Sequence, residues 1–286
     1  MVYPTYTPHR VIVKRTNDPT SANQVKTTKS LNEDEYRNLD VGTGPQGETS
    51  YNNLIIETTS VSAISITATS IDVENIRLSN VSTSADIPVS GAGGLDSGSE
   101  TANIWYAIYV ITNADGSLVN ALLSTSATSP SMPSGYTKKR RIGWVRNNGS
   151  SDFILGLQEN NIWLYQDPIT NCRILTSGQA LVFTDVSAAT AIPTTSQRGI
   201  FRATATADHN VAEVSFAGRI RTNGITPPAA GIVVPAYSQV ADIYIALSHV
   251  APLATDSSQI VEYKIDAVPS SNGGLNIDVV GYYDRI

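Results

Sequence analysis

The chain has 286 residues, of which 41% are hydrophobic and 15% are charged, and its formal net charge at pH 7 is −6. The hydrophobic content excludes a wholly disordered chain, and the acidic balance argues against a general binder of nucleic acid or of anionic membranes. The single cysteine, Cys172, excludes an internal disulfide, and because an apolar run follows it we expect a buried, unreactive thiol.

Residues 1–50 form the first segment and differ in composition from the rest. They hold six cations and six acids, and Ser30 precedes Glu33 at the spacing of a helix capping box. We therefore expect an extended arm with one short helix that docks on a neighbouring protein. The residues that we expect to make this contact are Tyr3, Tyr6, Arg10, Lys14, Arg15 and Tyr36.

From Tyr51 onward the hydrophobic pattern has a period of two, with branched residues such as Ile64 and Ile66 alternating with Ser and Thr. This alternation predicts β-strands. Short strands follow at roughly ten-residue spacing up to the end of the chain. We predict an all-β chain whose body, residues 51–286, is an antiparallel β-sandwich of jelly-roll type. The body forms either one domain or two subdomains, 51–186 and 198–286.

The stretch "NIWYAIYVITNADGSLVNALLS" predicts two strands around the turn at Asp115–Gly116. Its first strand carries large groups on both faces, so it packs on both sides or lies at a subunit interface. Exposed Tyr and Trp rings could alternatively stack on sugars. The candidate residues for an oligomer interface or for glycan stacking are Trp105, Tyr106, Tyr109, Arg140, Arg141 and Trp144.

The segment "YTKKRRIGWVRNNGSSDF" holds the only concentration of positive charge. Simple alternation places Arg140, Ile142, Trp144 and Arg146 on one face of a strand, with a type I′ turn at Asn148–Gly149 and a returning strand from Ser151. Gly143 leaves room for a neighbour's backbone or an aromatic ring. We expect Arg140 and Arg141 to pair with carboxylates across a subunit boundary. Because residues 51–135 contain one basic residue, Arg77, no nucleic-acid partner is expected.

No motif indicates catalysis, a metal or a cofactor. None of the histidines His9, His209 and His249 has a second ligand at metal-binding spacing. The acids that glycoside hydrolysis could use offer no preferred pair; they are Asp152, Glu159, Asp167, Asp185, Glu213, Asp242 and Glu262. The chain also lacks the apolar core of a signal peptide and any stretch of about 18 uncharged apolar residues. We expect no membrane insertion.

One segment, residues 96–157, resembles a segment of tailed-bacteriophage virion proteins, in particular tail-fibre-like structural proteins. The pieces that carry this resemblance are "DSGSE", "WYAIYVI", "LLSTSATSPSMPSGY", "KRRIG" and "VRNNGSSDF". The C-terminal "NIDVVGYYDRI" is similar to the last strand of such proteins. The resemblance implies an assembled, β-structured particle component, trimeric and without a catalytic role, found in the virion on its tail, baseplate or capsid.

Three hypotheses follow. The first is a non-enzymatic virion structural protein (a tail fibre or a capsid decoration protein) that docks on other virion proteins through residues 1–50. The second, compatible with the first, is a module for host attachment that binds a cell-surface glycan. The third is a small glycan depolymerase, although such enzymes usually carry a long repetitive β-helix and no such repeat occurs here.

Overall fold

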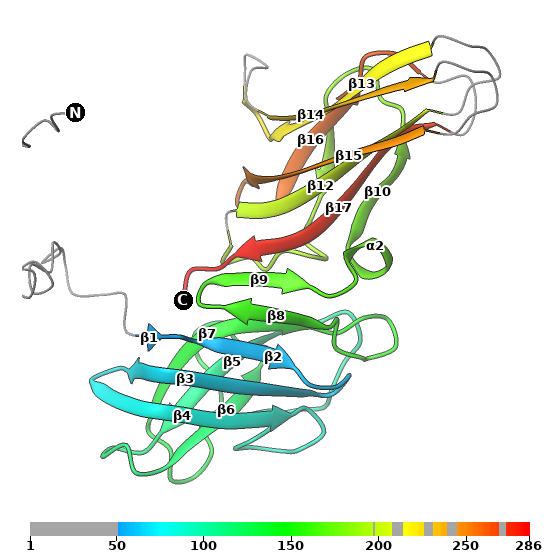
Figure 1. Ribbon diagram of the computed structural model, residues 1–286. Helices are drawn as coiled ribbons and strands as arrows, with labels where there is room; N and C mark the ends of the chain where they lie inside the picture. The colour runs from blue at the N-terminus through cyan, green and yellow to red at the C-terminus, as the bar shows by residue number, and fades with distance from the viewer. Residues whose placement is uncertain (1–50, 197, 208–213, 226–230, 239–244, 269–272) are drawn as a thin grey trace, which may run out of the picture. The chain divides into compact units, whose positions relative to one another are not determined.

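A computed structural model of the chain describes residues 51–196, 198–207, 214–225, 231–238, 245–268 and 273–286 (Figure 1). The chain divides into two compact units, Met1–Gln46 and Gly47–Ile286, and all of the described residues belong to the second. The predicted short helix after Ser30 and the six predicted docking residues of the arm lie outside the described residues.

Strands are the dominant secondary structure of the described residues and the helix among them has four residues, so the predicted all-β class with antiparallel sheets is confirmed. The strands up to the middle of the chain are β1 (Tyr51–Asn52), β2 (Ile55–Thr58), β3 (Ala63–Val73), β4 (Ile76–Asp86), β5 (Trp105–Thr112), β6 (Val119–Ser124), β7 (Lys138–Arg146), β8 (Gly156–Glu159) and β9 (Ile162–Tyr165). They are followed by the four-residue helix α2 (Pro168–Asn171), β10 (Arg173–Gly178), β11 (Thr184–Ser187), β12 (Arg198–Ala207), β13 (Val214–Thr222), β14 (Gly231–Ser238), β15 (Ile245–Ala254), β16 (Ile260–Ile265) and β17 (Gly274–Tyr283).

The first half of the body packs one sheet on another. β1 and β2 pair with one edge of β3 and β4 pairs with its other edge, while β5 lies between β6 and β7 in a separate three-stranded sheet. Ile64 and Ile66 of β3 are fully buried, as is Ile108 of β5, and all three belong to one core cluster. The alternation of branched and polar residues in β3 therefore places its apolar face against the second sheet, as the pattern predicts.

The second half of the body is also built from two layers. β12 pairs with β15 and β17, and β10 pairs with the other edge of β17; the facing sheet has the order β11-β16-β13-β14. Leu275 of β17 lies against the backbone of Gly218 in β13, where a Cβ atom would overlap its side chain. Phe201, Phe216 and Ile220 fill the space between the layers.

The short β8–β9 hairpin joins the two halves through backbone hydrogen bonds. β8 pairs with β2 and β9 pairs with β17, which makes β1, β3, β2, β8, β9, β17, β12 and β15 one continuous series (Figure 1). The two-subdomain alternative placed its boundary at residues 187–197. This boundary is wrong, because β10 and β11 precede it in sequence yet pair with β17 and β16.

The connection between β5 and β6 confirms the hairpin predicted at Asp115–Gly116, although the strands end at Thr112 and resume at Val119. Asp115 accepts a hydrogen bond from the backbone N–H of Ser117 (3.0 Å), and Gly116 has φ +79°. Within the part of the chain that the structure describes, no helix is long and apolar enough to cross a membrane.

The predicted geometry of β7 and of the turn after it is wrong in two respects. A β-bulge in β7 places Ile108 opposite Gly143 but Tyr109 opposite Arg141, so Ile142 is the extra residue. As a result, Ile142 and Trp144 belong to different core clusters instead of sharing one face. Asn148 and Gly149 begin a five-residue loop instead of forming a type I′ turn: Asn147 bridges Phe153, and Asn148 donates its backbone N–H to Asp152 O (2.8 Å). The next strand, β8, pairs with β2 and β9 instead of returning along β7.

Candidate functional site

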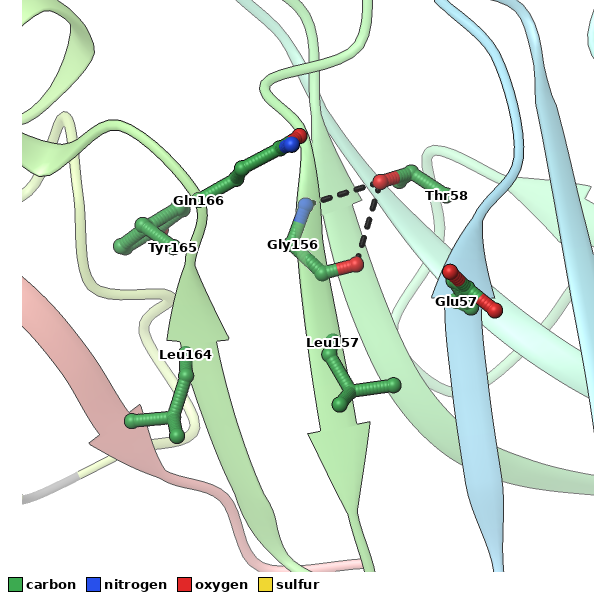
Figure 2. Close-up of a pocket in the computed structure, with 7 residues that line it drawn as sticks. All are labelled: Glu57, Thr58, Gly156, Leu157, Leu164, Tyr165 and Gln166. Carbon is green, nitrogen blue, oxygen red and sulfur yellow. Dashed lines mark hydrogen bonds between the residues drawn. The ribbon is translucent and has the colours of Figure 1, made fainter.

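The pocket drawn in Figure 2 lies over β2 and the β8–β9 hairpin and has a volume of about 300 Å³. Its framework is a pair of hydrogen bonds between segments 98 residues apart. The hydroxyl of Thr58 accepts from the backbone N–H of Gly156 (2.8 Å) and donates to the carbonyl of the same residue (3.1 Å). The remaining lining residues are Glu57, Leu157, Leu164, Tyr165 and Gln166.

The chemistry of this pocket is limited by its titratable groups, which are Glu57 and Tyr165. The Tyr165 hydroxyl donates to the carbonyl of Ala191 (2.7 Å), and burial raises the pKa of Tyr165 well above its usual value. Hydrolysis of a glycoside needs two carboxyl groups on facing elements, and the lining residues supply one. The pocket can accept polar groups at Glu57 and Gln166 beside the half-exposed Leu164 side chain.

A second groove of about 410 Å³ lies between β14 and β15 and is lined by Arg198, Thr222, Ile225, Gly231, Ile232, His249, Ala251, Pro252, Leu253 and Ala254. His249 is exposed there. Arg198 Cζ lies 5.9 Å from the ring centroid of Tyr283, within the limit of about 6 Å for a cation–π contact. Among the described residues, no group of three or more His, Cys, Asp or Glu side chains could hold a metal ion.

The aromatic residues predicted to form an interface or to stack on sugars lie mainly inside the chain. Tyr106, Tyr109 and Trp144 are buried, and Trp105 is partly buried. The Tyr109 hydroxyl donates to Ser126 O (2.8 Å), and the Trp144 indole donates to the hydroxyl of Thr195 (2.9 Å). The sugar-stacking alternative is therefore wrong for these three buried residues, because the chain's own core covers them.

Trp105 and Trp144 belong to a larger aromatic cluster that joins the two halves of the body. Trp105 packs edge-on against Trp144 (centroid distance 6.5 Å) and against Tyr282 of β17 (6.0 Å). Trp163 and Tyr165 of β9 complete the cluster through Tyr282, at 6.4 and 6.2 Å. All three tryptophans of the chain thus serve this internal junction.

The predicted arginine contacts also form within one chain. Arg141 pairs with the buried carboxylate of Asp284, and its guanidinium lies 5.4 Å from the ring centroid of Trp144. Arg140 donates to Asp72 O (3.0 Å) and lies over the ring of Tyr51. The expectation that Arg141 pairs across a subunit boundary is wrong, because the C-terminal segment supplies its partner.

Sequence reasoning missed Asp278, the carboxylate with the most complete set of partners in the body. It is fully buried in β17 and accepts hydrogen bonds from Arg173 of β10 (2.8 Å) and Arg202 of β12 (2.9 Å), which flank it in register. An acid within the apolar run "LNIDVVGY" was the available signal, since buried carboxylates are almost always paired.

The comparisons with known proteins add no family to this geometry. The chain matches no protein-family model, and a search of curated proteins finds no similar sequence.

Proposed function

We propose that the chain is a non-enzymatic structural protein of a tailed-bacteriophage particle. On this proposal it assembles as a homotrimer, and residues 1–50 dock on other particle proteins. The proposal starts from the resemblance of residues 96–157 to virion proteins, and the positions of the residues that carry this resemblance support it.

The pieces of the resembling segment are hydrogen-bonded to one another. In "DSGSE", the Asp96 carboxylate accepts from the hydroxyl of Ser124 and from the backbone N–H of Ser131, both at 2.7 Å. The Glu100 carboxylate in the same piece accepts from the side-chain amide of Asn147 in "VRNNGSSDF" (2.8 Å). The distant pieces are thus tied together at the three-stranded sheet.

The two tyrosines of "WYAIYVI" make the same kind of contact. The Tyr106 hydroxyl accepts from the backbone N–H of Thr101 (2.8 Å). The Tyr109 hydroxyl donates to the backbone carbonyl of Ser126 in the loop after β6 (2.8 Å). The side chains of Asp96, Glu100, Tyr106 and Tyr109 are thus hydrogen-bonded inside the chain. This internal framework is the observation that carries the proposal, because residues dedicated to a ligand would leave polar groups facing outward.

The glycan-binding hypothesis receives less support from the same geometry. Three of the rings proposed for stacking are buried, and the pocket over β8–β9 has the buried Tyr165 as its aromatic lining residue. Stacking on a sugar requires an accessible ring face. A scaffold role fits these positions better than a carbohydrate site does.

The proposal is tested on purified particles of the phage whose genome encodes the chain. Quantitative mass spectrometry is expected to find the chain at a constant copy number that is a multiple of three. Light scattering of the isolated protein is expected to give about three times the chain mass of 30.5 kDa. A chain that is abundant in the lysate and absent from washed particles would contradict a structural role.

A further inference from the structure

Arg146 is the last residue of β7, and 9% of its surface is exposed. It is the one buried arginine among the described residues. It lies opposite Trp105 in the register of β5 and β7, so both side chains leave the same face of the sheet. The backbone carbonyl of Arg146 is used, because it accepts from Ile154 N (2.8 Å).

Within the described residues, the guanidinium of Arg146 makes no hydrogen bond and no ion pair, whereas Arg141 pairs with Asp284 and both Arg173 and Arg202 pair with Asp278. Each of those three arginines is more exposed than Arg146. Arg146 is thus a buried arginine without a carboxylate partner among the described residues.

The groups beside Arg146 cannot supply that charge at neutral pH. They are the phenol of Tyr165 and the thiol of Cys172. Burial raises the pKa of Cys172 to about 12 and that of Tyr165 well above 10, so both stay neutral. Burial also lowers the pKa of Arg146, but a guanidinium stays charged under all ordinary conditions.

The nearby polar groups are also occupied by other contacts. The Trp105 indole donates to Ala189 O (3.0 Å), and the Tyr165 hydroxyl donates to Ala191 O (2.7 Å). The Arg146 nitrogens are not among the fully enclosed side-chain atoms that lack a partner, so they keep some contact with solvent. This contact and the unused N–H donors together allow a small anion to reach the guanidinium.

We propose that Arg146 is a binding site for a small monocarboxylate. The planar fork of N–H donors matches the two oxygens of a carboxylate. A single positive charge without a second cation beside it favours a monoanion over sulfate or phosphate, since a dianion would bury an uncompensated negative charge. The site makes the stability of the body depend on a small acid in the solution.

The experiment measures thermal unfolding of the full chain during titration with sodium acetate, with ionic strength held constant by the bulky buffer anion HEPES. A ligand that binds only the folded state raises the melting temperature with its concentration. We expect a rise of about 3 °C at an acetate concentration several times its Kd. Tryptophan fluorescence is expected to change over the same range, because Trp105 lies opposite Arg146.

The matched variants are Arg146→Met, which removes the guanidinium and keeps a long side chain, and Arg77→Met, which removes an exposed arginine paired with Asp72. The acetate response should be lost in Arg146→Met and kept in Arg77→Met. Sulfate stabilises folded proteins without binding a site, so the comparison uses the part of the rise that is lost in Arg146→Met; this part should be smaller with sodium sulfate than with acetate at equal ionic strength. An equal acetate response in Arg146→Met, or a larger Arg146-dependent rise with sulfate, would overturn the proposal.

A measurement on the unaltered protein covers the case in which Arg146→Met does not fold. Ligand-observed NMR should detect saturable transfer from the protein to acetate, and formate should displace it. The absence of saturable transfer to acetate would also overturn the proposal.

Discussion

At the scale of single residues, Asp278 is a buried carboxylate that is held by two arginines. Its carboxylate is fully buried, while the side chains of Arg173 and Arg202 are 32% and 23% exposed. A buried charge is tolerated when partners compensate it, and removal of one partner leaves the others uncompensated. Asp278 therefore holds β10, β17 and β12 together through charge as well as through backbone hydrogen bonds.

We predict that Asp278→Asn lowers the free energy of unfolding by about 3 kcal/mol, because two arginines lose their counter-charge. Urea denaturation at neutral pH measures this loss. The control is Asp72→Asn, which breaks the exposed pair with Arg77 and should lower stability by less than about 1 kcal/mol. Equal losses in the two variants would show that Asp278 has no special role.

Cys172 gives a pH-dependent prediction. Burial raises the pKa of its thiol from 9.0 to about 12, so above pH 9 the unfolded chain releases this proton while the folded chain keeps it. The contribution of the Cys172 thiol to the free energy of unfolding is therefore fully present below pH 9, and it is lost as the pH rises toward 12. Tyr109, whose pKa burial raises to about 12, acts in the same direction.

We predict that Cys172→Ala makes the loss of stability between pH 9 and 11 less steep, as measured by urea denaturation at a series of pH values. A thiol reagent at pH 8 should leave the folded protein unmodified and should modify one thiol per chain after unfolding. Rapid modification of the folded protein would contradict the burial of Cys172.

At the scale of elements, the bulge in β7 determines which side chains enter the core. Its extra residue, Ile142, has its carbonyl satisfied by the side-chain amide of Gln158 (2.7 Å), which is itself fully buried. Gly143 makes room for that amide, because a Cβ atom there would overlap Gln158 Oε1 and lie 3.1 Å from Ile56 Cδ1. The predicted neighbour of Gly143 was a backbone segment or a ring, and it is instead a buried amide.

We predict that Gly143→Ala lowers the free energy of unfolding by about 2 kcal/mol, through overpacking against Gln158. Gly149→Ala is the control, since the nearest atom to its added Cβ is 3.9 Å away, and its effect should stay within about 0.5 kcal/mol. In a Gln158→Ala background the cost of Gly143→Ala should shrink, because the overlapping amide is gone. An unchanged cost in that background would contradict the overlap.

At the scale of the whole molecule, the last strand of the chain is also one of its most central. β17 pairs with β9, β10 and β12, and eight of its ten residues are buried. Beyond it, Asp284 accepts from Thr195 (2.7 Å) and pairs with Arg141 of β7. The two halves of the body are thus joined by residues of β17 and of the segment that follows it.

We predict that deleting residues 1–45 leaves a folded oligomer that no longer enters particles, since all described strands and the core lie at residues 51–286. Thermal unfolding and light scattering should match those of the full chain, and mass spectrometry of particles should lack the truncated protein. Incorporation of the truncated protein would contradict the docking role of the arm.

The sequence alone was sufficient for properties that depend on neighbouring residues. Alternation at period two predicts the strands and the all-β class, Asp115–Gly116 predicts the β5–β6 hairpin, and the apolar run after Cys172 predicts a buried thiol. Each of these signals lies within a few residues of the feature that it predicts.

Only the tertiary structure decided which groups meet across long separations. The bulge at Ile142 changes the face of the following side chains, and the carbonyl of Ile142 accepts a hydrogen bond from Gln158 on another strand. Arg141 finds Asp284 at a separation of 143 residues, and the aromatic cluster draws on β5, β7, β9 and β17. Local periodicity carries no information on such partners, because strand register and sheet order are set by the packing of the whole core.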